Sequence, residues 1–181
     1  MRPLGYAVAV TALLLSASSL AEPSSYAGEQ TRAIKALSEQ EIGDYLAGKG
    51  MGLAKAAELN GYPGPAHVLD LAAELRLSPE QRARTEALHA EARRRAAAAG
   101  RALVDAENAF DRLFASKTAT VDGVRRTVRE AAERQAEVRF AHLEAHLAQA
   151  AILTPEQIAK YAELRGYGAA APHRGHAHGS H

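Results

Sequence analysis

The sequence predicts an all-α protein built around a long antiparallel helical hairpin. Three observations support this fold class. Aromatic residues are only 5% of the chain, Trp and Cys are absent, and the apolar fraction rests on Ala and Leu, which is typical of closely packed helices. Two long segments repeat apolar residues every three or four positions. Two nearly identical phrases, LSPEQ and LTPEQ, have the pattern of helix starts.

Residues 1–21 have the pattern of a signal peptide. Arg2 precedes an apolar run from Leu4 to Leu15, and small residues follow up to Ala21. The run is shorter than the roughly 20 apolar residues that a transmembrane helix needs. We therefore expect an exported, soluble mature chain that begins near residue 22 and does not span a membrane.

The charge balance disfavours nucleic-acid binding. The chain has 22 Lys and Arg against 21 Asp and Glu, so removal of a leader that contains Arg2 leaves a mature formal charge of zero. A neutral chain has no global attraction to phosphate or to anionic surfaces. Because an exported protein without Cys cannot use disulfides, packing or association must hold it together.

Short helices are expected before the hairpin. Residues 22–36 are polar and unpatterned, so we interpret them as a flexible lead. Ser38 and Glu41 form a capping-box pattern that predicts a helix over residues 39–47. The glycine-rich residues 48–52 should end that helix.

A further short helix is expected over residues 53–59. The NGYPGP sequence at residues 60–65 predicts a rigid turn. It places Pro65 at the first position of the next helix, over residues 65–75, where a missing N–H costs nothing.

The phrases LSPEQ at residues 77–81 and LTPEQ at residues 153–157 share one physical explanation. In each, Ser or Thr is placed to accept a hydrogen bond from a free backbone N–H, Pro occupies the first helical position, and Gln completes a capping box. The glutamate of each phrase adds a favourable charge at the positive end of the helix dipole. Both phrases are therefore predicted to start helices.

The first phrase starts a long helix over residues 79–116, and a second long helix over residues 121–151 follows a short polar break. Two long helices with a short connection fold back on each other as an antiparallel hairpin. The predicted seam of the first helix is Leu88, Ala92, Ala96, Ala99, Leu103, Ala106, Phe110 and Leu113. The predicted seam of the second helix is Val121, Val124, Val128, Ala131, Gln135 and Val138.

The second phrase opens a last helix over residues 155–164, which the glycines after it should end. The helical domain is thus expected to cover residues 37–167. Residues 168–181 are rich in Pro, Gly and His, so we predict a disordered tail.

Two LTxxQ-type phrases that flank a helical hairpin, behind a signal peptide and without Cys, resemble the Spy/CpxP family of periplasmic proteins. The segment GMGLAKAAELNGYPGPAHVLDLA is also similar to the heavy-metal sensors of this family, the CnrX-like branch. The resemblance implies a curved, mostly helical homodimer in the periplasm. It implies either metal sensing for a regulatory system or ATP-independent protection of unfolding envelope proteins, and it implies no catalysis.

His142 and His146, in the sequence RFAHLEAHL, are the sharpest chemical feature of the chain. Four residues apart, they share one face of the second long helix, and His142 continues its seam. Two neutral imidazoles on one face can share a Zn²⁺, Ni²⁺, Co²⁺ or Cu²⁺ ion, although a complete site needs further ligands. The alternative is that both histidines are amphipathic residues where the seam meets solvent or a dimer partner.

The resemblance to the CnrX-like sensors suggests where further ligands lie. Their ligands come from a His-x-x-x-His before the first phrase, an acidic residue after it, and a His-x-x-x-Met before the second. On this pattern His67 corresponds to the first His, Leu71 replaces the second, His89 stands at the acidic position, and His142 and His146 correspond to the last pair. Leu71 cannot bind a metal. The alternative is that His67 and His89 are surface side chains.

The tail sequence HRGHAHGSH contains half of the eight histidines of the chain: His173, His176, His178 and His181. A His-rich end of this kind can collect metal weakly and without a defined geometry. The alternative is a solubilising tail or an artificial remnant.

Two basic clusters are candidates for a client-binding surface. Family members that act as chaperones hold flexible clients on a cationic concave surface with apolar patches, and long-range attraction speeds the encounter. The alternative is a solvated helix face with ion pairs to Glu91, Glu130 and Glu133. The candidate residues are Arg93, Arg94, Arg95, Arg125, Arg126 and Arg129.

The sequence has no Ser/His/Asp constellation, phosphate-binding loop or close carboxylate pair, so we expect no enzyme. The first functional hypothesis is a periplasmic metal-responsive protein, with a divalent transition metal as cofactor and a membrane-bound regulatory protein as a possible partner. The second is an ATP-independent holdase for unfolded envelope proteins. A homodimer is expected in either case, because Ala-rich seams leave apolar surface uncovered.

Overall fold

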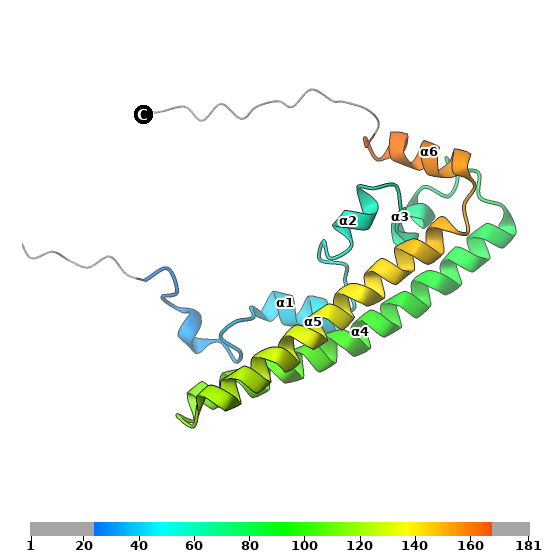
Figure 1. Cartoon of the computed structure of the whole chain (residues 1–181). Coiled ribbons are helices and arrows are strands. Elements are labelled where there is room, and N and C mark those ends of the chain that lie inside the picture. The colour runs from blue at the N-terminus through cyan, green and yellow to red at the C-terminus, as the bar shows by residue number, and fades with distance from the viewer. Residues whose placement is uncertain (1–23, 168–181) are drawn as a thin grey trace, which may run out of the picture. The chain divides into compact units, whose positions relative to one another are not determined.

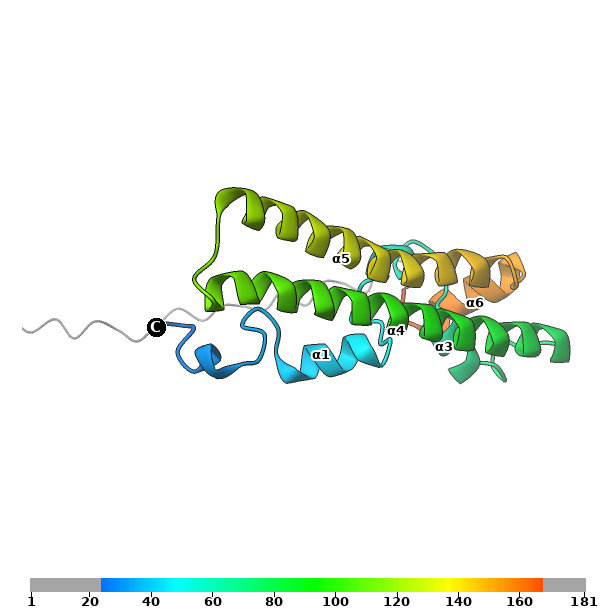
Figure 2. The ribbon, with the colours of Figure 1, turned by 90° about the horizontal axis from the view of Figure 1, so that it is seen from below.

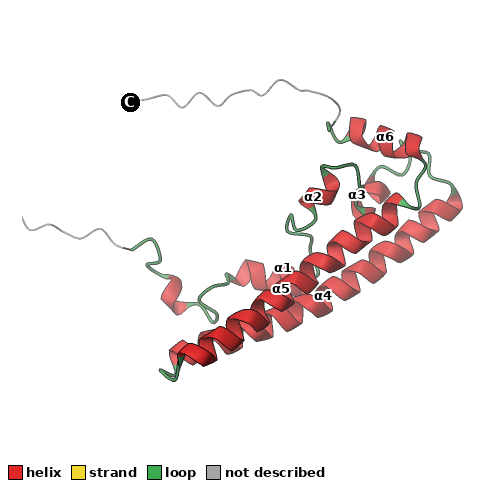
Figure 3. Cartoon of the chain, viewed as in Figure 1, coloured by secondary structure: helices red, strands yellow, loops and turns green. Residues whose placement is uncertain are grey.

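The computed structural model describes residues 24–167, and every regular element in that range is a helix (Figure 3). The expected signal peptide at residues 1–21 and the four tail histidines lie outside the described residues. Of the described residues, 24–30 belong to one compact unit and 31–167 to another. A single 3-10 turn, η1 (Glu29–Thr31), falls at this division. Every α-helix of the described range belongs to the second unit.

The predicted hairpin is confirmed. Helix α4 (Pro79–Ala115) and helix α5 (Val121–Ala150) run antiparallel side by side (Figures 1 and 2). Small residues along the shared seam let the two backbones approach closely, and larger side chains fill the gaps between them. The buried apolar residues of the seam are Ala96, Leu103, Ala106, Ala131, Val138, Ala141 and Ala145.

The predicted seam of α5 was wrong at its beginning. Val121 is 74% exposed and Val128 is 46% exposed. Counted at about 100° per residue, these two positions lie roughly 80° and 60° from Ala131, whereas Val138 and Ala145 lie close to it. The buried face of α5 is therefore centred on the small residues, and the two valines lie at its edge.

Helix α1 (Glu39–Leu46) packs on the side of α4, as Figure 2 shows. Its predicted capping box is present, because the Ser38 hydroxyl accepts from the Glu41 N–H and the Glu41 side chain accepts from the Ser38 N–H. The close approach depends on Gly100 of α4, where an added Cβ would collide with the backbone of Tyr45. Gly48, at φ +65°, then turns the chain directly over α4.

Helices α2 (Lys55–Glu58) and α3 (Pro65–Asp70) follow, and both are shorter than predicted. After α3 the hydrogen bonds alternate between i→i−3 and i→i−4, and Arg76 takes a positive φ of 51°. The chain must reverse there so that Ser78 can cap α4. Residues that were expected to continue α3 therefore form turns, although Ala72 and Leu75 remain buried.

Helix α6 (Pro155–Leu164) has the predicted bounds and closes a small apolar core with α3. This core contains Val68, Leu75, Leu153 and Tyr161. It lies at the end of the hairpin remote from the α4–α5 loop (Figure 1). The two repeated phrases meet at this end, because the side-chain amides of Gln81 and Gln157 exchange two hydrogen bonds of 2.8 and 3.0 Å.

Part of the expected lead contacts the hairpin. Ile34 is buried, and the backbone N–H of Lys35 donates to the Asp111 carboxylate at 3.1 Å. The residues after Thr31 are thus attached to α4. None of the helices within residues 24–167 combines the length and apolarity needed to cross a membrane.

Candidate metal-binding pocket

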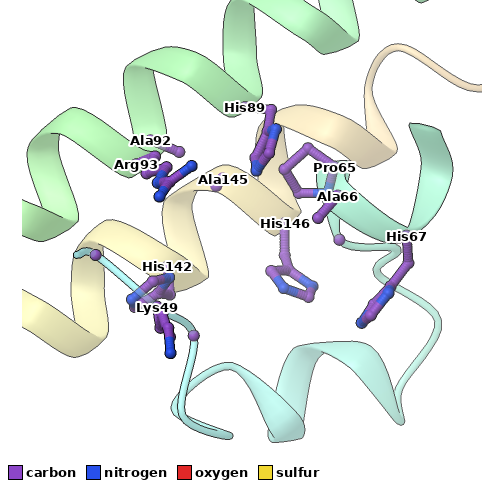
Figure 4. A pocket seen from close by; sticks show the side chains of 13 residues that line it. Lys49, Pro65, Ala66, His67, His89, Ala92, Arg93, His142, Ala145 and His146 are labelled. Atoms are coloured by element: carbon purple, nitrogen blue, oxygen red, sulfur yellow. The ribbon is translucent and has the colours of Figure 1, made fainter. Parts of the chain in front are cut away.

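Four histidines that the sequence singled out line one cavity of about 370 Å³ (Figure 4). His67 comes from α3, His89 from α4, and His142 and His146 from α5. The loop after α1, around Lys49, closes another side. None of the described residues that line this cavity is acidic.

His146 has one ring nitrogen engaged and the other available. Its Nδ1 lies 2.7 Å from the carbonyl oxygen of Tyr62, so Nδ1 carries the proton and donates in the neutral ring. Nε2 is then an unprotonated acceptor, which is the form that binds a metal. The ring is held against Gly64, where an added Cβ would lie only 3.0 Å from Nε2.

A carboxylate that the sequence reasoning missed stands behind His146. Oε2 of Glu58 lies 3.7 Å from Nδ1 of His146, and both side chains are largely buried, with exposures of 11% and 14%. Glu58 belongs to the short helix α2, and no spacing in the sequence connects it to His146, which is 88 positions further along. The one signal in the sequence was the predicted turn at residues 60–65, which reverses the chain and brings the helix before it close to the pocket.

His142 contributes a buried nitrogen without a partner. Its Nε2 is fully buried and makes no hydrogen bond, and Lys49 lines the same cavity. Burial lowers the pKa of His142, and the nearby His146 lowers it further, against an opposing contribution from the Lys49 backbone. His142 is therefore neutral at pH 7 and has a buried ring nitrogen without a hydrogen-bond partner, which suits a metal ligand.

His67 and His89 lie on the same cavity, but no described cluster of three or more His, Cys, Asp or Glu has the arrangement of a metal site. His67 is half-exposed, and its Nδ1 lies 3.6 Å from the Asp70 carboxylate. Figure 4 shows the four rings around the cavity and not converging on one point. The expected set of histidines is therefore gathered, without forming a complete coordination sphere.

The arginine clusters have mixed surroundings. Arg94 pairs with Glu91, Arg95 lies 2.6 Å from Glu144, and Arg93 donates from Nε to the carbonyl of Ala47 at 3.2 Å. On α5, Arg125 pairs with Asp122 at 2.9 Å. Arg126 and Arg129 line a shallow groove together with Glu130 and Glu133. The two clusters thus stand among acidic side chains and do not form a purely cationic surface.

The model of the LTXXQ motif family protein matches residues 66–165. This span contains both repeated phrases and all four pocket histidines. The chain belongs to the LTXXQ motif family. No curated protein and no solved structure matches the chain at a significant level. LTXXQ family membership supports the Spy/CpxP resemblance, and proteins of this family are in general periplasmic.

Stability of this LTXXQ family protein is expected to decrease as the pH falls below about 6.5. The folded state lowers the pKa of His142, so the unfolded state binds more protons on acidification, and the contribution of His142 is lost from its unfolded value of 6.5 downward. Urea unfolding at pH 7.5 and pH 5.5 would measure this loss. It should be smaller in His142→Gln, whereas His67→Gln should behave like the wild type. Equal pH dependence in both variants would contradict the burial of His142.

Proposed function

We propose that the chain is a periplasmic, non-enzymatic metal-binding protein of the heavy-metal sensor or resistance type, with His142 and His146 as the core of its site. The observation that carries this proposal is the buried, unpartnered Nε2 of His142 in the cavity that His146 also lines. A buried nitrogen without a hydrogen bond costs about 1–3 kcal/mol unless a ligand uses it.

The residues of the pocket suit a borderline transition metal. Neutral imidazoles bind Zn²⁺, Ni²⁺, Co²⁺ or Cu²⁺, and His67 or His89 could extend the ligand set. The Tyr62 carbonyl fixes the His146 tautomer that leaves Nε2 free. None of the described residues that line the cavity is acidic, so a bound metal changes the local charge strongly. In this proposal that change of charge is the signal.

Titration with Zn²⁺, Ni²⁺, Co²⁺ and Cu²⁺ tests the proposal. The four tail histidines should first be replaced by serine, so that weak binding to the tail does not obscure the pocket. We expect one tight equivalent per chain or per dimer, and His142→Ala combined with His146→Ala should weaken it by roughly 100-fold or more. The substitution His67→Ala should have a smaller effect.

Two outcomes would overturn the metal site. The first is retention of the tight equivalent by the double variant, and the second is failure of the parent chain to show one in isothermal titration calorimetry. Occupancy should also fall as the pH drops through about 6.5, because protons compete for the ring nitrogens. Tight binding that is insensitive to pH in this range would speak against histidine ligands.

The second candidate function is an ATP-independent holdase. It is favoured by large apolar side chains that are exposed along the hairpin, interspersed with arginines on α5. A flexible client could contact such a surface over many weak sites. These apolar residues are Phe114, Val121, Val128, Phe140 and Leu147.

Aggregation of a chemically denatured client, followed by light scattering in the presence of a chelator, tests this candidate. A holdase should suppress aggregation near stoichiometric amounts, and Phe140→Ser with Leu147→Ser should reduce the effect because both side chains are more than half exposed. No suppression by the wild type would remove the holdase function. Suppression without any tight metal equivalent would favour it over the metal site.

We also propose a homodimer, since family members are often dimers and the exposed apolar side chains of α5 need cover. Multi-angle light scattering should report twice the chain mass at micromolar concentrations. A monomer under these conditions would contradict the proposal. Unfolded envelope proteins or a membrane-bound regulator are the further partners that the two functions imply.

A further inference from the structure

Glu58 stands behind the histidine pocket, with one carboxylate oxygen directed toward His146 and Gly64. Its Oε2 accepts from the Gly64 N–H at 3.2 Å and lies 3.7 Å from Nδ1 of His146. Tyr62, whose carbonyl accepts from the same Nδ1, belongs to the intervening turn. Glu58 therefore fixes the backbone turn beside the pocket, and its carboxylate places a negative charge close to His146.

The other carboxylate oxygen of Glu58 faces the end of α6. Oε1 accepts from the hydroxyl of Tyr161 at 2.5 Å and from the hydroxyl of Tyr167 at 3.1 Å. Nε of Arg165 lies 3.4 Å from the same oxygen. One oxygen thus gathers two donors and a guanidinium from residues 161–167, the last described part of the chain.

Because this carboxylate is largely buried, it strongly affects the charge state and the hydrogen bonding of the groups beside it. Tyr161 is only 2% exposed, and burial together with the negative Glu58 raises the pKa of its hydroxyl well above the usual range, so the group remains a donor. At low exposure the negative charge of Glu58 acts on His146 with little screening by water. A metal ion bound to His146 is stabilised by that carboxylate.

We propose that Glu58 couples the histidine pocket to the docking of the end of α6, so that metal binding and docking strengthen each other. The proposal rests on the metal-binding function proposed above. The hydroxyls of Tyr161 and Tyr167 hold the carboxylate in the orientation that aims Oε2 at His146. Metal at the pocket in turn strengthens the attraction that fixes Glu58. Such coupling is reciprocal. If metal binding strengthens docking by a given factor, loss of docking must weaken the affinity for the metal by the same factor.

The coupling has a consequence for signalling. Residues 161–167 are the part of the helical unit from which the chain continues toward its C-terminus, and their attachment depends on Glu58. Metal binding would thereby change the stability of the contacts that attach residues 161–167 to the rest of the helical unit. A partner that binds the released segment would respond to the metal without contacting the pocket.

The first test measures affinity for Zn²⁺ in the full chain with the tail histidines replaced by serine. The variant Tyr161→Phe with Tyr167→Phe removes both hydroxyls and keeps the rings. We expect its dissociation constant for Zn²⁺ to rise roughly 5- to 50-fold. The matched control is Lys160→Ala, which breaks an exposed ion pair of 3.0 Å with Glu163 on the same helix and should leave the constant unchanged.

The second test follows docking directly by hydrogen exchange of the α6 backbone amides. In the wild type, Zn²⁺ should slow exchange in α6 relative to the same protein in chelator. In Glu58→Gln, which keeps the shape of the side chain but removes its charge, Zn²⁺ should no longer slow it. This measurement also decides the matter if the tyrosine variant does not fold.

The two proposals fail in distinguishable ways. Suppose that the wild type binds one tight Zn²⁺ equivalent. The coupling is then overturned, and the metal site stays intact, if a folded tyrosine variant keeps the same dissociation constant for Zn²⁺. The same holds if hydrogen exchange in α6 does not change when Zn²⁺ is added. Absence of any tight equivalent in the wild type overturns the metal site, and the coupling falls with it. A Lys160→Ala effect as large as that of the tyrosines would assign the loss to α6 stability in general and also overturn the coupling.

Discussion

Replacing Gln157 with alanine is expected to destabilise the protein by about 3 kcal/mol, measured as the free energy of unfolding in urea. The side chain makes four contacts at once. Its Oε1 accepts from the Thr154 N–H at 2.9 Å and from Gln81, while its Nε2 donates to Gln81 and to the Leu75 carbonyl at 3.1 Å. Alanine therefore removes half of a helix cap and leaves partly buried polar groups of α4 and the preceding turn without partners.

The corresponding Gln81 has the same set of contacts, reaching the Ile152 carbonyl at 3.0 Å in place of Leu75. A double-mutant cycle with Gln81→Ala should thus give a coupling energy of about 1 kcal/mol or more between the two glutamines. Gln40→Ala, an exposed glutamine on α1, is the control and should change stability by less than about 0.5 kcal/mol. Strictly additive losses would contradict the reciprocal pair.

The repeated phrase shows which part of the fold could be predicted from the sequence. Capping boxes and Pro at the first helical position depend on residues within four positions of each other, so the starts of α1, α4 and α6 were predicted correctly. The pairing of Gln81 with Gln157 spans 76 positions. Local patterns carry no information about that contact, and the phrases were explained only as two separate helix starts.

The same distinction between local and long-range information applies to the candidate site. The spacing of His142 and His146 on one helix was sufficient to select them, and the resemblance to metal sensors added His67 and His89. What the sequence could not supply is the state of each nitrogen, since the lone Nε2 of His142 and the bond of His146 to Tyr62 arise from tertiary packing. Glu58 was missed for the same reason.

The early seam of α5 failed for a different physical reason. Apolar residues spaced three and four apart were assumed to face α4, which placed Val121 and Val128 in the core. Packing in this hairpin favours small residues because they bring the helix axes closer, so Ala131, Ala141 and Ala145 occupy the seam. Val121 and Val128 lie at the edge of that face and remain exposed, whereas Val138, close to Ala131 around the helix, is buried.

Replacing Gly100 with alanine is expected to destabilise the protein by about 2 kcal/mol, although alanine is the better helix former by about 1 kcal/mol. An added Cβ at Gly100 would collide with the carbonyl group of Tyr45, and backbone atoms cannot rotate away as a side chain does. Helix α1 must therefore move off α4. The matched control is Gly43→Ala on α1, where no atom lies within 4 Å of the added Cβ, so that variant should gain about 0.5–1 kcal/mol.

Gly100→Ala should also change metal binding at the histidine pocket. Helix α1 leads directly into Gly48, Lys49 and Gly50, which line the cavity together with His142. Displacement of α1 would move these residues and expose Nε2 of His142 to water, so Gly100→Ala should weaken Zn²⁺ binding while Gly43→Ala should not. Urea unfolding and Zn²⁺ titration of both variants measure the two effects. If the two alanine variants were equally stable, α1 could not be packed against Gly100, and the wall of the pocket that Lys49 provides would have no support.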